Sequence, residues 1–275
     1  MKVSYNNTNN LFSNDSSDVL IEVGDYGAAI AWYNKETLSI SGVKLYQFKN
    51  NNALEITGHL SQIFKENNFE EKTTTIFFDF QESVLVPDKF YNIENEDDIL
   101  NLMFGIKDSI VKSEKFNLSN RDKSADVINV YRIEHEVNSL VNTYFPGTKT
   151  YHSSTMQVKD AENGLNVSLF NNSIKVLLKE DGEFKFIKHF NYKTPVDVVY
   201  CLLDVCKNYN VSPENIVVKL KGMIDKESNL YKEIEKYFML VKFETPAPEV
   251  SFNLPVDELS NHYFVNLTHL IKCVS

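Results

Sequence analysis

The chain has 275 residues, of which 43% are hydrophobic, and carries a formal net charge of −10. This length suits one large domain or two small ones, each with its own core. The acidic charge repels phosphate backbones, so we expect no nucleic-acid partner. We expect no membrane span either, because no apolar run reaches the ~18 residues that one needs.

The first half of the chain predicts one α/β unit. Residues 1–17 are polar and are expected to form a mobile tail. Hydrophobic periodicity then predicts the following elements in order: strands at 19–23, 28–33 and 37–48, a helix at 53–64, and a strand at 74–80. The unit continues with an extended run at 83–86, a helix at 96–104, a hairpin at 115–132, a helix at 134–145 and a strand at 149–153.

Residues 163–242 repeat much of this order. Strands at 165–170, 174–178 and 184–190 are joined by turn residues and form a meander. A helix then begins at Thr194 and Pro195, and a strand at 215–220, a helix at 228–238 and a strand at 240–243 follow it. A meander followed by alternating helices and strands is the ribonuclease-H-like order.

The predicted fold class is therefore α/β, with two ribonuclease-H-like units that each contain a mixed five-stranded sheet. We place the units at residues 18–155 and 156–250 and interpret residues 154–164 as a crossing between them. A final helix within 251–275, predicted at 256–273, is expected to pack back on the body.

Three short sequence patterns are distributed over most of the chain. They are residues 84–87 (VLVP) with Phe90, residues 144–146 (YFP) with His152, and residues 261–264 (NHYF). With the duplicated unit, they resemble a bacterial family of uncharacterised proteins, a domain of unknown function found mostly in Bacteroidota. The family is assigned the actin-like ATPase fold, so the resemblance implies that architecture.

The superfamily binds nucleotide at three short motifs, and the resemblance places them here in altered form. In the first phosphate motif Glu22 stands in place of Asp, followed by Gly24 and Asp25. In the second, Asn166 replaces the Asp and Ser168 replaces the Gly.

The third motif, a Gly-Gly pair, keeps only Gly222, and Asp225 follows it closely. Phosphoryl transfer depends on Mg²⁺ placement and charge stabilisation, so these losses matter. An amide at position 166 cannot supply the charge that orders Mg²⁺. A turn without Gly does not easily bring its N–H groups to phosphate.

We therefore expect no catalytic residue, no metal and no cofactor. The predicted function is a non-catalytic binding or assembly module in the cytoplasm, with a protein partner. The alternative is an ATP-binding protein or ATPase that uses Mg²⁺ and non-standard cleft residues. Its nucleotide-binding residues would be Glu22, Gly24, Asp25, Asn166, Ser168, Gly222 and Asp225.

Other candidate residues have simpler interpretations. Asp79 lies among phenylalanines and is interpreted as an outward-facing strand residue, because no second acid is placed to pair with it. Asp225 is interpreted as the cap of the next helix. Lys175 and Lys221 are interpreted as surface lysines.

Histidines and cysteines give no metal motif. His262 and His269 are seven residues apart and make an incomplete zinc site. Cys201, Cys206 and Cys273 are interpreted as buried thiols of a reducing compartment.

Overall fold

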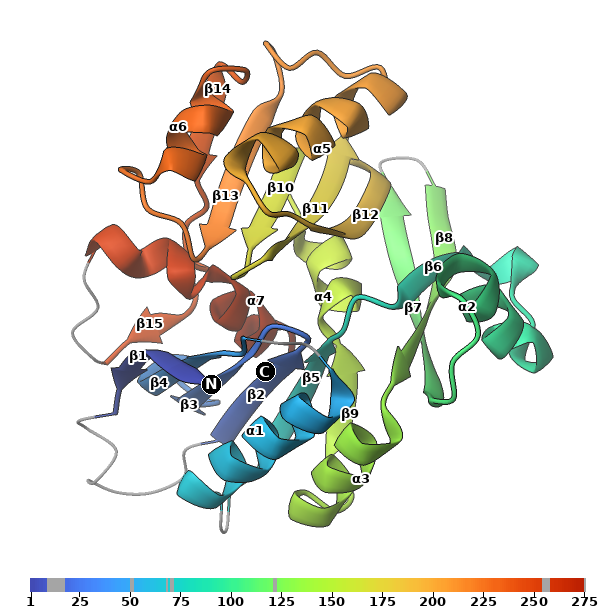
Figure 1. The fold of residues 1–275 in the computed structure, drawn as a ribbon, viewed down its shortest axis with the longest axis vertical. Coiled ribbons are helices and arrows are strands. Elements are labelled where there is room, and N and C mark those ends of the chain that lie inside the picture. The colour runs from blue at the N-terminus through green and yellow to red at the C-terminus, as the bar shows by residue number, and fades with distance from the viewer. Residues whose placement is uncertain are drawn as a thin grey trace. The chain divides into compact units, whose positions relative to one another are not determined.

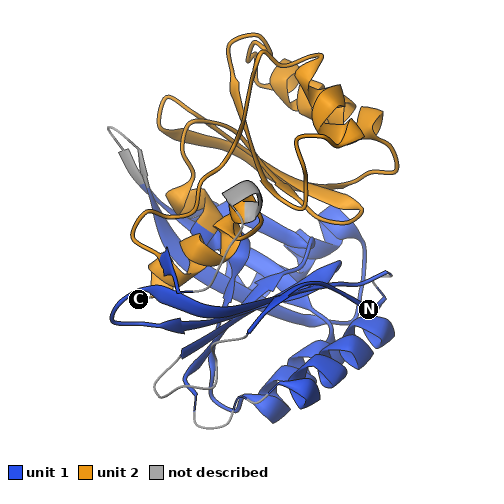
Figure 2. Ribbon diagram, turned by 90° about the vertical axis from the view of Figure 1, so that its left-hand side faces the viewer, with its two compact units in different colours: residues 1–156, 251–254, 275 blue, residues 157–250, 255–274 orange. Residues whose placement is uncertain are grey.

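The computed structural model describes residues 1–8, 18–49, 52–67, 69, 72–120, 123–253 and 258–274. The chain divides into two compact units, residues 1–156 with 251–254 and 275, and residues 157–250 with 255–274 (Figure 2). Each unit has its own sheet and its own hydrophobic core.

The first unit is built on a seven-stranded sheet (Figure 1). The strand order is β1-β4-β3-β2-β5-β9, with β15 paired to β4. The strands are β1 (Lys2–Asn7), β2 (Asp18–Gly24), β3 (Gly27–Asn34), β4 (Ser39–Gln47), β5 (Thr74–Asp79), β9 (Lys149–His152) and β15 (Ser251–Phe252). Neighbours among β2, β3 and β4 are antiparallel, whereas β5 runs parallel to β2 and β9 parallel to β5.

Two helices cover one face of this sheet, α1 (Ala53–Glu66) and α3 (His135–Tyr144). Alternate residues of β2, such as Ile21, point to that face and pack with Leu60 and Val137. The Asn52 side chain accepts a hydrogen bond from the Glu55 N–H and so caps α1.

An insertion follows β5 and forms a second, three-stranded sheet in the order β6-β8-β7. Its elements are β6 (Ser83–Pro87), two 3₁₀ helices η1 (Asp88–Phe90) and η2 (Ile93–Asn95), α2 (Glu96–Phe104), β7 (Ile110–Asn120) and β8 (Lys123–Ile133). A small core of Val86, Leu100, Ile128 and Val130 holds α2 against the sheet. The predicted helix and hairpin of this region are both present.

The second unit has a five-stranded sheet in the order β12-β11-β10-β13-β14. Its strands are β10 (Gly164–Leu169), β11 (Ser173–Glu180), β12 (Glu183–Asn191), β13 (Val217–Gly222) and β14 (Leu240–Phe243). Its helices are α5 (Pro195–Asn208), α6 (Asn229–Glu235), the 3₁₀ helix η3 (Glu258–Tyr263) and α7 (Val265–Val274), and α4 (Ser153–Asp160) precedes β10. Thr194 and Asp197 form a capping box at the start of α5, as Thr194-Pro195 predicted.

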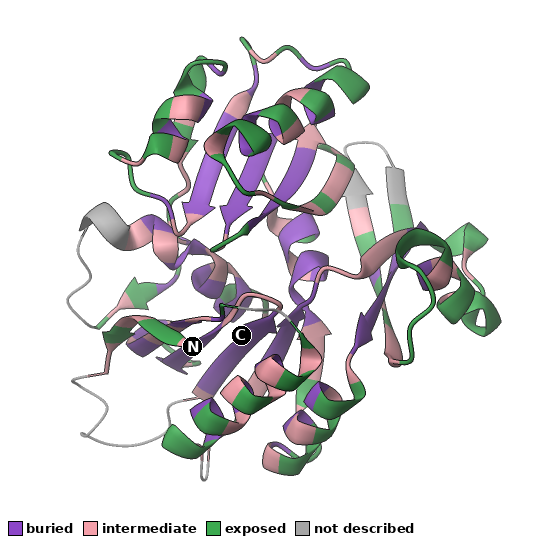
Figure 3. Ribbon diagram, viewed as in Figure 1, coloured by how far each residue is buried: buried purple, intermediate pink, exposed green. Residues whose placement is uncertain are grey.

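Both units share the same strand pattern. In each, a three-stranded antiparallel meander is extended by two parallel strands beside its first strand. The prediction of two ribonuclease-H-like units is confirmed. The purple, buried residues of Figure 3 lie mainly along these strands and along the helix faces that cover them.

Several expectations about the elements and the cysteines differ from the structure. The first sheet has seven strands and not the predicted five, because β1 and β15 both pair with β4. Residues 2–7, expected in a mobile tail, form β1 on β4, while residues 9–17 lie outside the described part. The crossing at 154–164 contains the helix α4. The C-terminal helix begins only at Val265, after a 3₁₀ turn. Cys273 is exposed and Cys201 is half-buried, so only Cys206 is a buried thiol.

Candidate functional site

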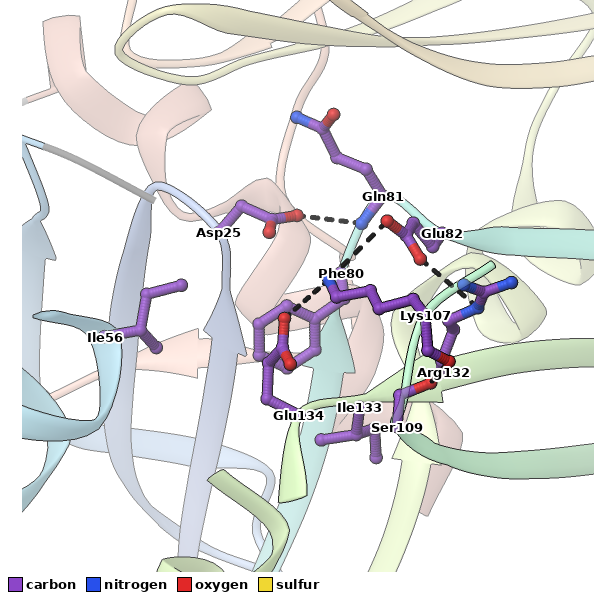
Figure 4. A pocket seen from close by; sticks show the side chains of 10 residues that line it. All are labelled: Asp25, Ile56, Phe80, Gln81, Glu82, Lys107, Ser109, Arg132, Ile133 and Glu134. Atoms are coloured by element: carbon purple, nitrogen blue, oxygen red, sulfur yellow. Dashed lines mark hydrogen bonds and ion pairs between the residues drawn. The ribbon is translucent and has the colours of Figure 1, made fainter. Parts of the chain in front are cut away.

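The turn between β2 and β3 borders a cavity within the first unit (Figure 4). The cavity has a volume of about 150 Å³. It is lined by the turn, by α1, by the segment between β5 and β6, and by the segments that flank α2 and α3. Its lining residues are Asp25, Ile56, Phe80, Gln81, Glu82, Lys107, Ser109, Arg132, Ile133 and Glu134. Of the seven predicted site residues, only Asp25 lines it.

Asp25 has an unusual carboxyl group. Its Oδ2 accepts a hydrogen bond from the Gln81 N–H at 2.8 Å. Burial raises the pKa of Asp25 from 3.8 to about 7; the charges of Asp79 and Glu82 add to this rise, and the Gln81 bond and Lys107 oppose it. Near neutral pH, Asp25 is therefore divided between its protonated and ionised forms.

Both cations of the cavity are held by carboxylates. Lys107 Nζ lies 2.5 Å from Glu134 Oε1 and 3.7 Å from Glu82 Oε1. Burial works against the Lys107 charge, but the bond to Glu134 and the neighbouring carboxylates outweigh it and raise the pKa of Lys107.

Arg132 is almost fully buried and lies with its Nε 3.3 Å from Glu82 Oε2. Its guanidinium also donates to Gly105 O at 3.0 Å and to Asn101 Oδ1 at 3.2 Å. When Asp25 is protonated, the negative charges of Glu82 and Glu134 balance the positive charges of Lys107 and Arg132. The cavity then offers polar groups but no surplus positive charge for a polyphosphate.

Glu22 and Gly24 do not line this cavity. Glu22 is buried in the middle of β2, opposite Ala29 on β3 and Phe77 on β5. Gly24 lies beside Asp79 at the end of β5, and a Cβ there would lie 2.7 Å from Asp79 O. The close approach of the two strands therefore accounts for this glycine.

Asp79 belongs to a buried polar network, so its interpretation as an outward-facing residue was wrong. The Ser153 hydroxyl donates to Asp79 Oδ1. His152 Nε2 lies 3.1 Å from Phe80 O, which can only accept, and His152 Nδ1 accepts from the Ser154 N–H at 3.2 Å. Serine, histidine and aspartate meet here, but the serine donates to the aspartate and both histidine nitrogens bond to backbone, so the arrangement is not that of a catalytic triad.

Glu114 on β7 ties the insertion to α4. Its Oε1 accepts from Tyr131 OH at 2.9 Å and from the His152 N–H at 2.6 Å, and its Oε2 accepts from Thr155 Oγ1 at 2.8 Å. Burial and the Glu114 charge raise the pKa of Tyr131. Tyr131, His152 and Thr155 are buried, Glu114 is partly buried, and all are hydrogen-bonded to one another, so we assign this network a structural role.

In the second unit, Asn166 and Ser168 are both buried on β10. Asn166 Nδ2 donates to Glu162 O at 2.9 Å and to Gly164 O at 3.2 Å. The amide is thus used to fix the start of its own strand. Ser168 lies between Lys175 on β11 and Lys221 on β13.

Both lysines are buried, so their interpretation as surface lysines was wrong. Lys175 Nζ donates to Gln157 Oε1 at 2.8 Å, and Lys221 Nζ lies 3.1 Å from Glu244 Oε2.

Gly222 and Asp225 also have structural explanations. Gly222 has φ = +85°, and a Cβ there would lie 2.4 Å from Leu169 O. Asp225 accepts a hydrogen bond from Tyr263 OH. It does not cap the next helix as predicted, because the Ser228 side chain accepts the Tyr231 N–H at the start of α6.

The two C-terminal histidines have different partners. His262 Nε2 lies 2.5 Å from Ile224 O, and His269 contacts Asp160. Within the described residues, no group of three His, Cys, Asp or Glu side chains is placed to hold a metal ion. No helix among them is long and apolar enough to cross a membrane.

Residues 6–241 match the family described as "Protein of unknown function (DUF3822)". The chain belongs to this family. A search of curated proteins gave no match to this DUF3822 chain.

Solved structures share the fold of this DUF3822 protein at low identity. A Bacteroides thetaiotaomicron protein with an actin-like ATPase fold and unknown function has a TM-score of 0.72 at 16% identity, covering 94% of this chain and 96% of the other. The PilM–PilN type IV pilus biogenesis complex gives 0.59 at 10% identity, with 95% and 100% covered. Ethanolamine utilization protein EutJ from Carboxydothermus hydrogenoformans gives 0.52 at 9% identity, with 94% and 90% covered. The actin-like ATPase fold is thereby established.

Proposed function

We propose that this protein is a non-catalytic binding or assembly module of the cytoplasm, which keeps the actin-like ATPase fold without a nucleotide cofactor. One observation carries the proposal: polar side chains that the resemblance assigns to nucleotide have partners within the protein. Asp25 is bonded to the Gln81 N–H, Asn166 to the Glu162 and Gly164 carbonyls, and Asp225 to Tyr263. A ligand that uses the bonded atoms, Asp25 Oδ2, Asn166 Nδ2 and Asp225 Oδ1, would have to displace these bonds. Asn166 Oδ1 is buried and has no hydrogen-bond partner among the described residues, so the proposal rests on the bonded atoms.

Two further facts support a protein partner. One structural neighbour, at a TM-score of 0.59, was solved as a complex, PilM with PilN. The net charge of −10 also opposes the binding of a polyanion such as ATP. Both favour a role in assembly over one in phosphoryl transfer.

The first test is a thermal shift of the full chain with ATP, ADP and Mg²⁺, each at millimolar concentration. A ligand that binds only the folded state at 100 times its Kd adds about 2.7 kcal/mol, which corresponds to a shift of several degrees. We expect no shift and no phosphate release above a protein-free control. A nucleotide-dependent shift with turnover would overturn the proposal.

Asp25 favours one alternative, an ATP-binding protein. A carboxyl group with a pKa of about 7 beside a cavity is the type of group that general acids and bases require. If the wild type responds to ATP, Asp25→Asn decides whether this group is responsible. Loss of the shift in Asp25→Asn, in a variant that still unfolds cooperatively without ligand, would assign nucleotide to this cavity.

A further inference from the structure

Exposed apolar side chains are concentrated on the insertion of the first unit. Six of the large exposed hydrophobic residues in the described chain lie within residues 90–106: Phe90, Ile93, Leu102, Met103, Phe104 and Ile106. Leu102 and Ile106 are 87% and 94% exposed. Figure 3 shows this part of α2 and the segment after it in green. We call Leu102, Met103, Phe104 and Ile106 the α2 apolar end.

The internal packing of the insertion does not use these side chains. α2 contacts the small core through Leu100, which is fully buried, and Ile99, which is partly buried. Leu102 lies two positions beyond Leu100, about 200° around the helix, and so faces away from that core. Exposed contiguous apolar residues on a folded protein mark sites of interaction.

The apolar end is held in a fixed position. Gly105, at φ = +90°, ends the helix, and its N–H donates to Asn101 O at 2.9 Å. The buried Arg132 guanidinium donates to Gly105 O and to Asn101 Oδ1. A surface fixed before binding loses less conformational entropy when a partner docks.

The charge around the apolar end specifies the partner. Residues 88–108 contain six acidic residues (Asp88, Glu94, Glu96, Asp97, Asp98 and Asp108) and two basic ones (Lys89 and Lys107), which gives a net charge of −4. Asp97 and Asp98 are exposed in the first turn of α2. A second copy of this chain would bring another −10, and an anionic lipid surface would also be repelled.

We propose that the α2 apolar end, with the acidic turn before it, is a docking surface for a basic amphipathic segment of another protein. Such a segment places leucine-like side chains on the apolar end and lysine or arginine side chains beside Asp97 and Asp98. The proposal rests on the proposed function in one respect, since it names the partner of the binding module.

The experiment measures fluorescence anisotropy of a labelled amphipathic helical peptide built from leucine and lysine, titrated with the full chain. A peptide with the same leucines and glutamate in place of lysine is the charge control. We expect binding of the leucine–lysine peptide with a Kd on the order of 10 µM, weakened several-fold between about 0.05 and 0.5 M NaCl. The leucine–glutamate peptide should not bind.

Matched variants locate the contact. Leu102→Ser with Ile106→Ser should weaken binding about tenfold or more, because it removes two exposed apolar anchors. Val196→Ser with Tyr200→Ser removes exposed apolar groups from α5, where these residues are 58% and 70% exposed, and should leave the Kd unchanged. Asp97→Asn with Asp98→Asn should weaken binding and reduce its salt dependence. Exposed positions tolerate such changes, and melting temperatures verify folding.

Several results would overturn the proposal. They are equal binding by the Leu102/Ile106 variant and the wild type, an equal loss in the α5 variant, and equal binding of the glutamate peptide. If the wild type is a dimer and the Leu102/Ile106 variant is a monomer, the surface would be assigned to a second copy. Binding to phosphatidylcholine–phosphatidylglycerol vesicles that the same variant abolishes would assign it to lipid. A response to ATP bears only on the proposed function, so the two failures are distinguishable.

Discussion

At the scale of single residues, Asp25 shows how the fold gives a side chain a property that the sequence does not reveal. The pattern Glu22–Gly24–Asp25 placed it in a phosphate motif only through resemblance. Its carboxyl group is instead directed at the Gln81 backbone, 56 positions away in the chain. Burial at this contact raises its pKa to about 7, and no local pattern records such a long-range effect.

The Asp25 pKa predicts a pH-dependent stability. Its value is about 7 when folded and 3.8 in the unfolded chain, so between these pH values the folded state binds more protons. The contribution of Asp25 to stability is therefore present at low pH and is lost as pH rises through 7. The Asp25→Asn variant has no carboxyl group at this position and does not lose stability in this way. Its stability relative to the wild type should therefore rise by roughly 2–3 kcal/mol from pH 5 to pH 8.

Urea denaturation of both proteins at the two pH values measures this difference. Titration of the Asp25 carboxyl carbon by NMR measures the pKa directly. An unchanged difference in stability between pH 5 and pH 8, with a carboxyl that titrates near 4, would contradict the prediction.

Replacement of each of two glycines by alanine should change the stability of the protein in opposite directions. Gly222→Ala places a Cβ at 2.4 Å from Leu169 O in a left-handed backbone, so it should destabilise the protein by about 2 kcal/mol or more. Gly58 lies exposed within α1, and a Cβ there would meet no atom within 4 Å, so Gly58→Ala should stabilise by about 0.5–1 kcal/mol. The melting temperatures of the two variants test both predictions. A Gly222→Ala variant with an unchanged melting temperature would show that β13 and β10 can separate.

At the scale of elements, the sequence predicted those whose periodicity reflects a local core. The helix at 96–104 agrees with α2, and the strand at 165–170 agrees with β10 to within one residue. β1 was missed because its polar residues pair with β4 across about forty positions, and α4 was missed because its amphipathic pattern is weak. Tertiary contacts, not propensity, decide such segments.

Arg132 predicts how the insertion is held together. Arg132→Met leaves Gly105 O, Asn101 and Glu82 without its hydrogen bonds and charge, so it should cost about 2–4 kcal/mol and loosen the end of α2. Hydrogen exchange of residues 96–106 should accelerate. Lys115→Met is the control, because this exposed lysine joins Asp88 and Asp126 at the surface and should change exchange in α2 little. Equal exchange in both variants would contradict this role.

At the scale of the whole molecule, the duplication could be predicted because the order of elements repeats within one chain. Of the candidate site, only Asp25 could be predicted from the sequence. Lys107, and Arg132 with Glu134 at the junction of β8 and α3, reach the Asp25 cavity from parts of the chain distant in sequence from Asp25 and belong to no motif. Asn166 and Gly222 were interpreted as remnants of nucleotide motifs, and the structure accounts for both by contacts within the second unit.

The net charge of −10 predicts how the whole protein responds to salt. Self-repulsion destabilises a compact acidic chain, and salt screens it over about 10 Å at 0.1 M. Raising NaCl from about 0.02 to 0.2 M at pH 7.5 should therefore stabilise the folded state by about 1 kcal/mol, measured as a higher urea midpoint. Asp97→Asn with Asp98→Asn lowers the negative charge and should reduce this response. A midpoint that falls with salt would instead mean that the ion pairs around Lys107, Arg132 and Lys221 outweigh the repulsion of the surface acids.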